Sequence, residues 1–193
     1  MPKPTLIVNL YGGPGAGKTT CAWEIASELK KRGYNAEYVS EYAKELVYEG
    51  RTDLLDGTVE HQTLLFREQK HRLDRLLGKV EVVVTDSPLL LSQVYLQEKD
   101  PTFLQTVRQA SDEYHSFNLV VRRGNAFQQA GRIHNEQQSK QLDAEILRML
   151  DANGLYYGIY DHSRIQLCAS NIERTYKRIC GQTVKRMSPK HIR

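Results

Sequence analysis

The residues LIVNLYGGPGAGKTT at positions 6–20 constrain this chain more than any other stretch. Within them, positions 12–19 match G-x-x-x-x-G-K-[ST], a pattern whose backbone N–H groups enclose the phosphates of a nucleotide. The residues before it, 5–11, are apolar and predict a strand, and those after it, 20–31, have the apolar spacing of a helix. The pattern requires this strand-to-helix context. The sequence therefore predicts nucleotide binding rather than a glycine-rich turn that binds nothing.

Each part of this phosphate loop has an expected role. Glycines lack a Cβ and can take positive φ, which lets successive N–H groups and the positive end of the helix converge on an anion. We expect Lys18 to reach the β- and γ-phosphate oxygens and the hydroxyl of Thr19 to bind the Mg²⁺ that bridges them. The residues expected to bind ATP are Gly13, Pro14, Gly15, Ala16, Gly17, Lys18, Thr19 and Thr20.

Two acidic residues follow predicted strands. Glu41 follows the strand at 35–40, and Asp86 ends the Val-rich run KVEVVVTD at 79–86, which is typical of a strand buried on both faces of a parallel sheet. The carboxyl ends of parallel strands meet at one edge. We expect Asp86 to bind Mg²⁺ or its water shell, and Glu41 to accept the proton of an acceptor hydroxyl, although the two roles could be exchanged. Alternatively, Glu41 only charges the N-terminal end of a short helix.

A basic stretch from Arg122 to Arg132 follows the strand predicted at 117–122. A guanidinium group can bind two phosphate oxygens at once. A lid that closes only over bound substrate would also exclude water from the site. We expect such a lid here, with a solvated surface loop as the alternative. The catalytic candidates are thus Lys18, Glu41, Asp86, Arg123 and Arg132.

Predicted strands and helices alternate along the chain. Strands are expected at 5–11, 35–40, 79–86, 117–122 and 155–160, and helices at 20–31, 41–47, 58–77, 89–98, 102–115, from 135 and at 165–179. This order predicts a three-layer α/β fold, with a five-stranded, mostly parallel sheet and helices on both faces. Trp23, Leu64, Leu77 and Leu147 are expected on the apolar faces of their helices. A chain of 193 residues is expected to form one domain over residues 1–193.

Charge is distributed unevenly in a chain whose net charge is +4. From Arg164 to the end, eight Lys and Arg residues are accompanied by one acid, Glu173. A basic segment over about 164–193 can attract nucleic acid, although a charged chain end is more often simply solvated. Both interpretations remain open at this point.

The cysteines and the apolar segments limit the class of protein. Cys21, Cys168 and Cys180 are odd in number and lack C-x-x-C spacing, which argues against a disulfide framework and against a zinc site. A small buried side chain is expected for Cys21. No apolar run is long enough to span a bilayer, and the N-terminus lacks the features of a secretory signal. We therefore expect a cytoplasmic protein with no membrane partner.

The motifs together resemble the P-loop kinases of the bacterial ribosylnicotinamide kinase type and the similar small P-loop ATPases or kinases of many bacteriophages. The resemblance covers about residues 4–162 and rests on GGPGAGKTT at 12–20, EYAKELV at 41–47, VVVTDSPLLLSQVY at 82–95, DEYHSFNLVVRR at 112–123 and AGR at 130–132. It implies a kinase-like P-loop NTPase fold with a lid after the fourth strand, ATP and Mg²⁺ as ligands, and the host cytoplasm if the protein is phage-encoded.

Residue by residue, the resemblance assigns Lys18 and Thr19 to phosphates and metal, Asp86 to the carboxylate after the third strand, and Glu41 to the acceptor side. Asp86 is followed by Ser-Pro rather than by a second acid, and no residues match the family's recognition of nicotinamide. The resemblance therefore does not identify the phosphoryl acceptor.

Three functions are compatible with these observations. We predict an ATP-dependent kinase that phosphorylates a hydroxyl of a nucleoside, nucleotide or similar small molecule. The basic C-terminal segment favours an alternative, a kinase for nucleic acid of the phage type that phosphorylates hydroxymethylated bases in DNA, or a polynucleotide kinase. An ATPase without a phosphoryl acceptor is the third hypothesis. The sequence does not determine the oligomeric state.

Overall fold

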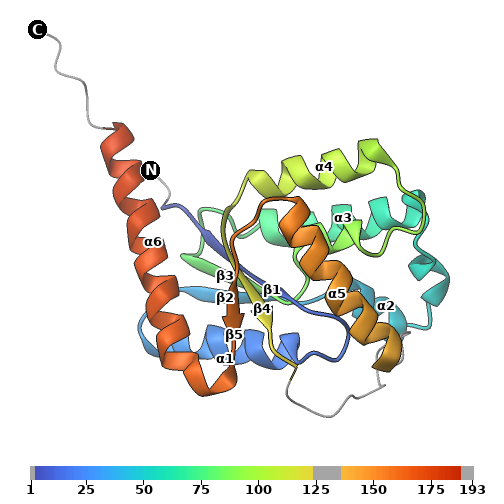
Figure 1. Cartoon of the computed structure of the whole chain (residues 1–193). Coiled ribbons are helices and arrows are strands. Elements are labelled where there is room, and N and C mark those ends of the chain that lie inside the picture. The colour runs from blue at the N-terminus through green and yellow to red at the C-terminus, as the bar shows by residue number, and fades with distance from the viewer. Residues whose placement is uncertain (1–2, 124–135, 188–193) are drawn as a thin grey trace, which may run out of the picture.

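The computed structural model describes residues 3–123 and 136–187. Five strands form one sheet in the order β2-β3-β1-β4-β5, and every neighbouring pair is parallel (Figure 1). The strands are β1 (Leu6–Tyr11), β2 (Ala36–Val39), β3 (Val82–Thr85), β4 (His115–Val121) and β5 (Gly158–Tyr160). This confirms the five-stranded sheet, and it places the strand that precedes the phosphate loop at the centre.

Six α-helices and three short 3₁₀ helices connect these strands in the described part of the chain. The α-helices are α1 (Lys18–Lys31), α2 (Tyr42–Tyr48), α3 (Val59–Asp74), α4 (Pro101–Asp112), α5 (Glu136–Ala152) and α6 (Ile165–Met187). The 3₁₀ helices are η1 (Thr52–Leu55), η2 (Leu89–Gln93) and η3 (His162–Arg164). None of the helices in these described segments combines the length and the apolar run that a bilayer crossing needs.

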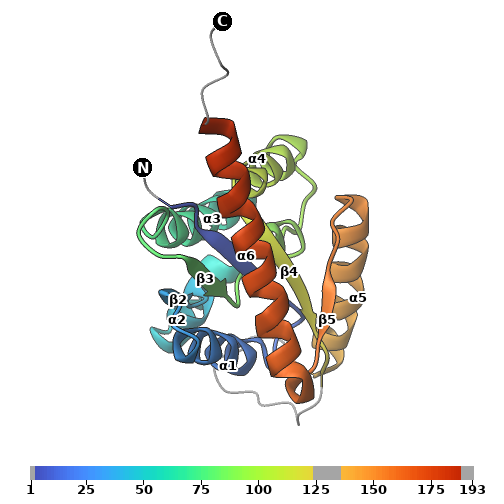
Figure 2. The same cartoon turned by 90° about the vertical axis from the view of Figure 1, so that its left-hand side faces the viewer.

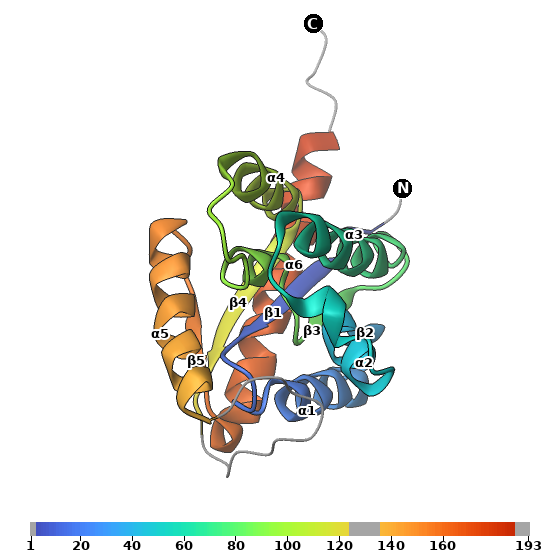
Figure 3. The ribbon, with the colours of Figure 1, turned by 90° about the vertical axis from the view of Figure 1, so that its right-hand side faces the viewer.

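The central strand explains why helices cover both faces of the sheet. Every residue of β1 is buried. Because side chains alternate along a strand, Leu6, Val8 and Leu10 pack in one core with α1 and α6, whereas Ile7 and Tyr11 pack in a second core with α3, α4 and α5. Figure 2 shows α6 running across the first face, and Figure 3 shows α3, α4 and α5 over the second. The three-layer arrangement predicted from the sequence is confirmed.

Parallel pairing brings the ends of the central strands to one edge. Asn9 pairs with Thr85, and Val39 also pairs with Thr85, so β1, β2 and β3 end close to one level. The phosphate loop, Glu41 and Asp86 follow these strand ends directly. The fold therefore delivers the predicted site residues to one edge before any side-chain contact is considered.

The predicted apolar faces were wrong at four positions. The exposed fractions are 60% for Trp23, 41% for Leu64, 37% for Leu77 and 37% for Leu147. In α1 the buried residues include Cys21, Ala22, Ile25 and Leu29, so Trp23 lies beside the buried stripe rather than on it. In α3 the buried stripe is Gln62, Leu65, Phe66, Gln69 and Leu73. Two buried glutamines belong to that stripe, whereas Leu64 lies outside it and is exposed. The expected burial of Cys21 is confirmed.

Several predicted boundaries also shift. The helix expected at 89–98 is only the short η2, and α4 begins at Pro101 because the side chain of Asp100 accepts a hydrogen bond of 2.6 Å from Phe103 N. It ends before the predicted boundary because β4 already begins at His115. Helix α6 continues beyond the predicted end at Ile179 to Met187.

Candidate active site

The phosphate loop joins β1 to α1 through three glycines with positive φ. The angle is +152° at Gly12, +75° at Gly15 and +95° at Gly17, the residue before α1. Inside the loop, Lys18 Nζ donates to the main-chain oxygens of Gly12 (2.7 Å) and Gly13 (3.2 Å). The first turn of α1 contains no acidic residue, so no side-chain carboxylate there offsets the positive end of the helix. The loop thus has the backbone shape and charge of an anion site.

A threonine, a carboxylate and a tyrosine meet beside the loop. Asp86 is 1% exposed, and its Oδ2 accepts hydrogen bonds from Thr19 Oγ1 (2.6 Å) and from Tyr38 OH (2.8 Å). Burial, and secondly the charge of Asp86, raises the pKa of Tyr38, so the phenol remains a hydrogen-bond donor. The structure brings together Thr19 and Asp86 as the sequence predicted, whereas Tyr38 was not anticipated.

This constellation fits a hard divalent cation. Asp86 Oδ1 is fully buried and has no hydrogen-bond partner among residues 3–123 and 136–187. A buried, unpartnered carboxylate oxygen next to a threonine hydroxyl is a donor set that Mg²⁺ uses, with water or phosphate oxygens completing its shell. The described residues contain no cluster of three or more His, Cys, Asp or Glu side chains that could hold a metal by themselves. Thr19 and Asp86 therefore suit a cation shared with a bound phosphate.

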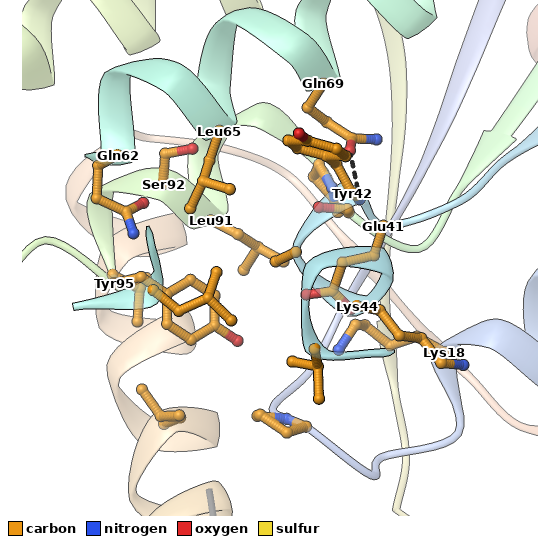
Figure 4. A pocket seen from close by; sticks show the side chains of 18 of the residues that line it. Lys18, Glu41, Tyr42, Lys44, Gln62, Leu65, Gln69, Leu91, Ser92 and Tyr95 are labelled. Atoms are coloured by element: carbon orange, nitrogen blue, oxygen red, sulfur yellow. Dashed lines mark hydrogen bonds between the residues drawn. The ribbon is translucent and has the colours of Figure 1, made fainter. Parts of the chain in front are cut away.

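A pocket of about 580 Å³ extends from the phosphate loop. Gly15, Lys18 and Thr19 form one wall, α2 forms a second, and α3 with the segment after η2 closes the far end. Figure 4 shows Lys18, Glu41 and Lys44 on one side of this pocket and Gln62, Ser92 and Tyr95 on the other. The volume is in the range of small-molecule sites.

Glu41 lines this pocket at the start of α2. It is the residue before the helix, with extended backbone (φ −68°, ψ +119°), and its side chain makes no capping hydrogen bond. The helix start is held instead by Gln69, whose Oε1 accepts from Tyr42 N (3.1 Å) and whose Nε2 donates to Ser40 O (3.2 Å). Burial, followed by the charge of Glu41, raises the pKa of Tyr95 across the pocket. The carboxylate of Glu41 therefore faces the pocket (Figure 4).

Arg123 lies against the phosphate loop itself. Its guanidinium donates to Asp143 Oδ2 (2.8 and 3.1 Å), to Ser139 Oγ (2.7 Å) and to Pro14 O (3.3 Å). Asp143 Oδ1 in turn accepts a 2.6 Å hydrogen bond from Gly13 N, and Ser139 Oγ donates to Pro14 O. Helix α5 is therefore docked on the phosphate loop through an arginine–carboxylate pair.

Sequence reasoning missed this docking by α5. Ser139 and Asp143 are four residues apart and so share one face of the helix, but no motif distinguishes that polar face from an ordinary solvated one. Arg132 and the rest of the predicted lid after Arg123 fall within positions 124–135, which lie outside the described residues.

A comparison with models of protein families finds a match that includes the phosphate loop and residues of all five strands of the sheet. A family model described as "AAA domain" matches residues 7–164. No curated protein sequence matches this chain.

Two solved structures with similar folds are known kinases. The first is the Mycobacterium tuberculosis APS kinase CysC in complex with AMPPNP and APS, with 14% identity, a TM-score of 0.50, and an alignment covering 91% of this chain and 99% of that one. The second is the thymidylate kinase from Ehrlichia chaffeensis, with 15% identity, a TM-score of 0.60, and coverage of 89% and 98%. Likeness at these identities shows a shared fold. Because the family model spans most of the chain and the sheet order and loop agree, this protein belongs to the AAA domain family and has a kinase-like P-loop NTPase fold.

Proposed function

We propose that this protein transfers the γ-phosphate of ATP, in the presence of Mg²⁺, to a hydroxyl of a nucleoside, nucleotide or similar small molecule. The pocket carries this proposal, because one cavity continues from the phosphate loop past Glu41 to a chamber lined by α3 and the segment after η2, which lies beyond the loop that would hold the triphosphate. An ATPase without an acceptor needs the phosphate loop and a water molecule, but it does not need this chamber.

The nucleotide end of the site positions the triphosphate. The N–H groups of the loop and the positive end of α1 face the phosphates, and the Lys18 ammonium exchanges its carbonyl partners for phosphate oxygens. Thr19 and Asp86 would hold the Mg²⁺, which when bound neutralises charge on the β- and γ-phosphates. The hydrogen bond from Tyr38 keeps Asp86 oriented toward Thr19.

The acceptor end of the site supplies a base. Glu41 stands between the phosphate loop and the chamber, where its carboxylate can take the proton of an acceptor hydroxyl as the new P–O bond forms. Gln69 holds the start of α2 and thereby the position of Glu41. Tight positioning matters because phosphoryl transfer depends on alignment more than on covalent help from the protein.

Two arginines remain candidates for charge stabilisation. Arg123 places a cation beside Pro14 at the mouth of the phosphate loop, where Asp143 orients it. Arg132 retains its proposed role in a lid after β4. Both solved neighbours are named as kinases, and the first was solved with AMPPNP and APS bound together, which supports a site for two ligands in this fold.

The test is transfer of label from γ-labelled ATP to a panel of nucleosides, nucleotides, nicotinamide riboside and modified DNA. Lys18→Ala should abolish transfer, and Glu41→Gln should reduce turnover by about 10²–10⁴-fold while ATP affinity is retained. Lys30→Ala, which removes an exposed ion pair with Glu37, is the matched control and should behave as wild type. Full turnover by either site variant contradicts the proposal.

The same panel separates the alternatives. Steady phosphate release with no labelled acceptor indicates an ATPase without an acceptor. Label on DNA, with affinity that falls steeply with salt, indicates a nucleic-acid kinase. Four described basic side chains of the C-terminal segment are exposed: Arg164 at the end of η3, and Arg174, Lys177 and Arg178 in α6. None of them lines the pocket, so the structure adds no support to the nucleic-acid alternative.

A further inference from the structure

One residue of the pocket has no part in the transfer described above. Gln62, in the first turns of α3, lines the pocket and is only 4% exposed. Its side-chain amide makes no hydrogen bond within residues 3–123 and 136–187, and Figure 4 shows it directed into the pocket. Its amide atoms are open to the pocket rather than sealed within the protein, since Asp86 Oδ1 is the sole fully buried side-chain N or O atom without a partner among the described residues. A ligand in the pocket can therefore make the hydrogen bonds that the protein does not make.

A second glutamine of α3, Gln69, has a structural role and serves as a comparison for Gln62. Gln69 is 5% exposed and lines the same pocket, but both ends of its amide are bonded to the main chain, at Tyr42 N and Ser40 O. The two residues lie seven positions apart, which places them on one face of α3. Because the sequence puts glutamine at both positions and only one is bonded, Gln62 is the one available to a ligand.

The surroundings of Gln62 favour a flat ligand. The aromatic ring of Tyr95 and the apolar side chains of Leu65 and Leu91 line the same pocket, and Ser92 adds a hydroxyl near this end (Figure 4). Apolar walls beside the unbonded amide of Gln62 suit a planar ring with one polar edge. A carboxamide presents N–H and C=O side by side, so it binds a group that has an acceptor next to a donor.

We propose that Gln62 determines specificity by binding the edge of a planar heterocycle or carboxamide that carries a hydrogen-bond donor next to an acceptor, as nucleobases do. Gln62 and Glu41 line opposite ends of the pocket in Figure 4, so a ligand that reaches both is longer than a single ring. A nucleoside satisfies this requirement, with its ring at Gln62 and a sugar hydroxyl toward Glu41. The assignment rests on the proposed kinase function, but its test does not require turnover.

The experiment measures binding to the full chain by calorimetry, without ATP. The ligands are uridine, inosine and adenosine, each paired with a counterpart methylated on the polar edge (3-methyluridine, 1-methylinosine and N6,N6-dimethyladenosine), together with nicotinamide riboside. For at least one pair, wild type should bind the unmethylated nucleoside about tenfold more tightly, the effect expected from losing one or two neutral hydrogen bonds. Gln62→Met, of similar size but without the amide, should bind both members of that pair equally.

Two further variants provide controls. Gln69→Met should lower the midpoint of denaturant unfolding, because it leaves two main-chain groups unpaired, yet it should retain the preference of wild type. Gln62→Met should unfold at or above the wild-type midpoint. If Gln62→Met does not fold, Gln62→Leu replaces it and should lose the preference, because its side chain can neither accept from the N–H that methylation removes nor donate to the neighbouring acceptor.

The outcomes are distinct from those of the transfer assay. The proposal for Gln62 is overturned if wild type binds none of the panel, binds both members of every pair equally, or if Gln62→Met keeps the preference. If the preference depends on Gln62 but no labelled acceptor is ever found, the proposed kinase function fails while the binding role of Gln62 stands.

Discussion

Gly13 lies where the phosphate loop packs against α5, and replacing it with alanine tests that contact. A Cβ at this position would lie 2.5 Å from Ser139 O, 2.9 Å from Asp143 Oδ1 and 3.0 Å from Ser139 Oγ. Because Ser139 O belongs to the main chain of a helix, rotation of a side chain cannot relieve the closest contact. We expect Gly13→Ala to push α5 away from the loop.

The expected loss in the free energy of unfolding follows from the contacts between the loop and α5 that this displacement breaks. Overpacking of this kind costs about 1–3 kcal/mol. The 2.6 Å hydrogen bond from Gly13 N to the Asp143 carboxylate contributes about 1.5–3 kcal/mol. The Arg123–Asp143 pair is partly exposed and adds less than about 1 kcal/mol. These terms overlap, because one movement causes all three losses. Gly13→Ala should therefore lower the free energy of unfolding by about 2–4 kcal/mol.

Denaturant unfolding followed by circular dichroism measures this change, and calorimetry with ATP measures the accompanying loss of nucleotide affinity. Gly181→Ala is the matched control, since Gly181 is exposed within α6 and a Cβ there would contact nothing within 4 Å. That control should raise the free energy of unfolding, by up to about 1 kcal/mol. If Gly13→Ala changes it by less than about 0.5 kcal/mol, the size of an ordinary surface substitution, the docking of α5 on the loop does not exist as described.

Three other predictions concern metal binding, pH and thiol reactivity. Asp86→Asn should make ATP affinity insensitive to added Mg²⁺ in calorimetry, and a wild-type response to Mg²⁺ would remove Asp86 from the metal site. Two hydrogen bonds from Arg72 (2.6 and 2.7 Å) lower the pKa of Glu45, so the stability they add is present above its usual pKa of 4.5 and is lost as pH falls below it. Glu45→Gln should therefore lose less stability than wild type in acid unfolding, and equal losses would contradict this linkage. Burial raises the pKa of the Cys21 thiol to about 12, so near neutral pH iodoacetamide should label the half-buried Cys180 first; mass spectrometry showing Cys21 labelled first would contradict its burial.

Local patterns in the sequence determined the elements and the edge on which the site is built. A strand, a glycine-rich turn and the start of a helix are encoded within fifteen consecutive residues, because each depends on neighbours a few positions away. Val-rich strands that alternate with helices then require parallel pairing, and parallel pairing brings Glu41 and Asp86 to the phosphate loop. The hydrogen bond between Thr19 and Asp86 agrees with this reasoning across 67 residues of sequence.

Only the tertiary structure decided which polar side chains meet. Tyr38 contacts Asp86 because β2 lies beside β3, and Asp143 reaches Gly13 because α5 packs over the loop, yet neither residue belongs to a recognisable pattern. The sequence also does not determine the rotation of a helix about its own axis. A shift of one residue in the buried stripe of α3 exposes Leu64 and takes Gln62 into the pocket. Sequence periodicity locates such a stripe only approximately, because successive side chains differ by about 100° and the neighbouring elements select the face that is buried.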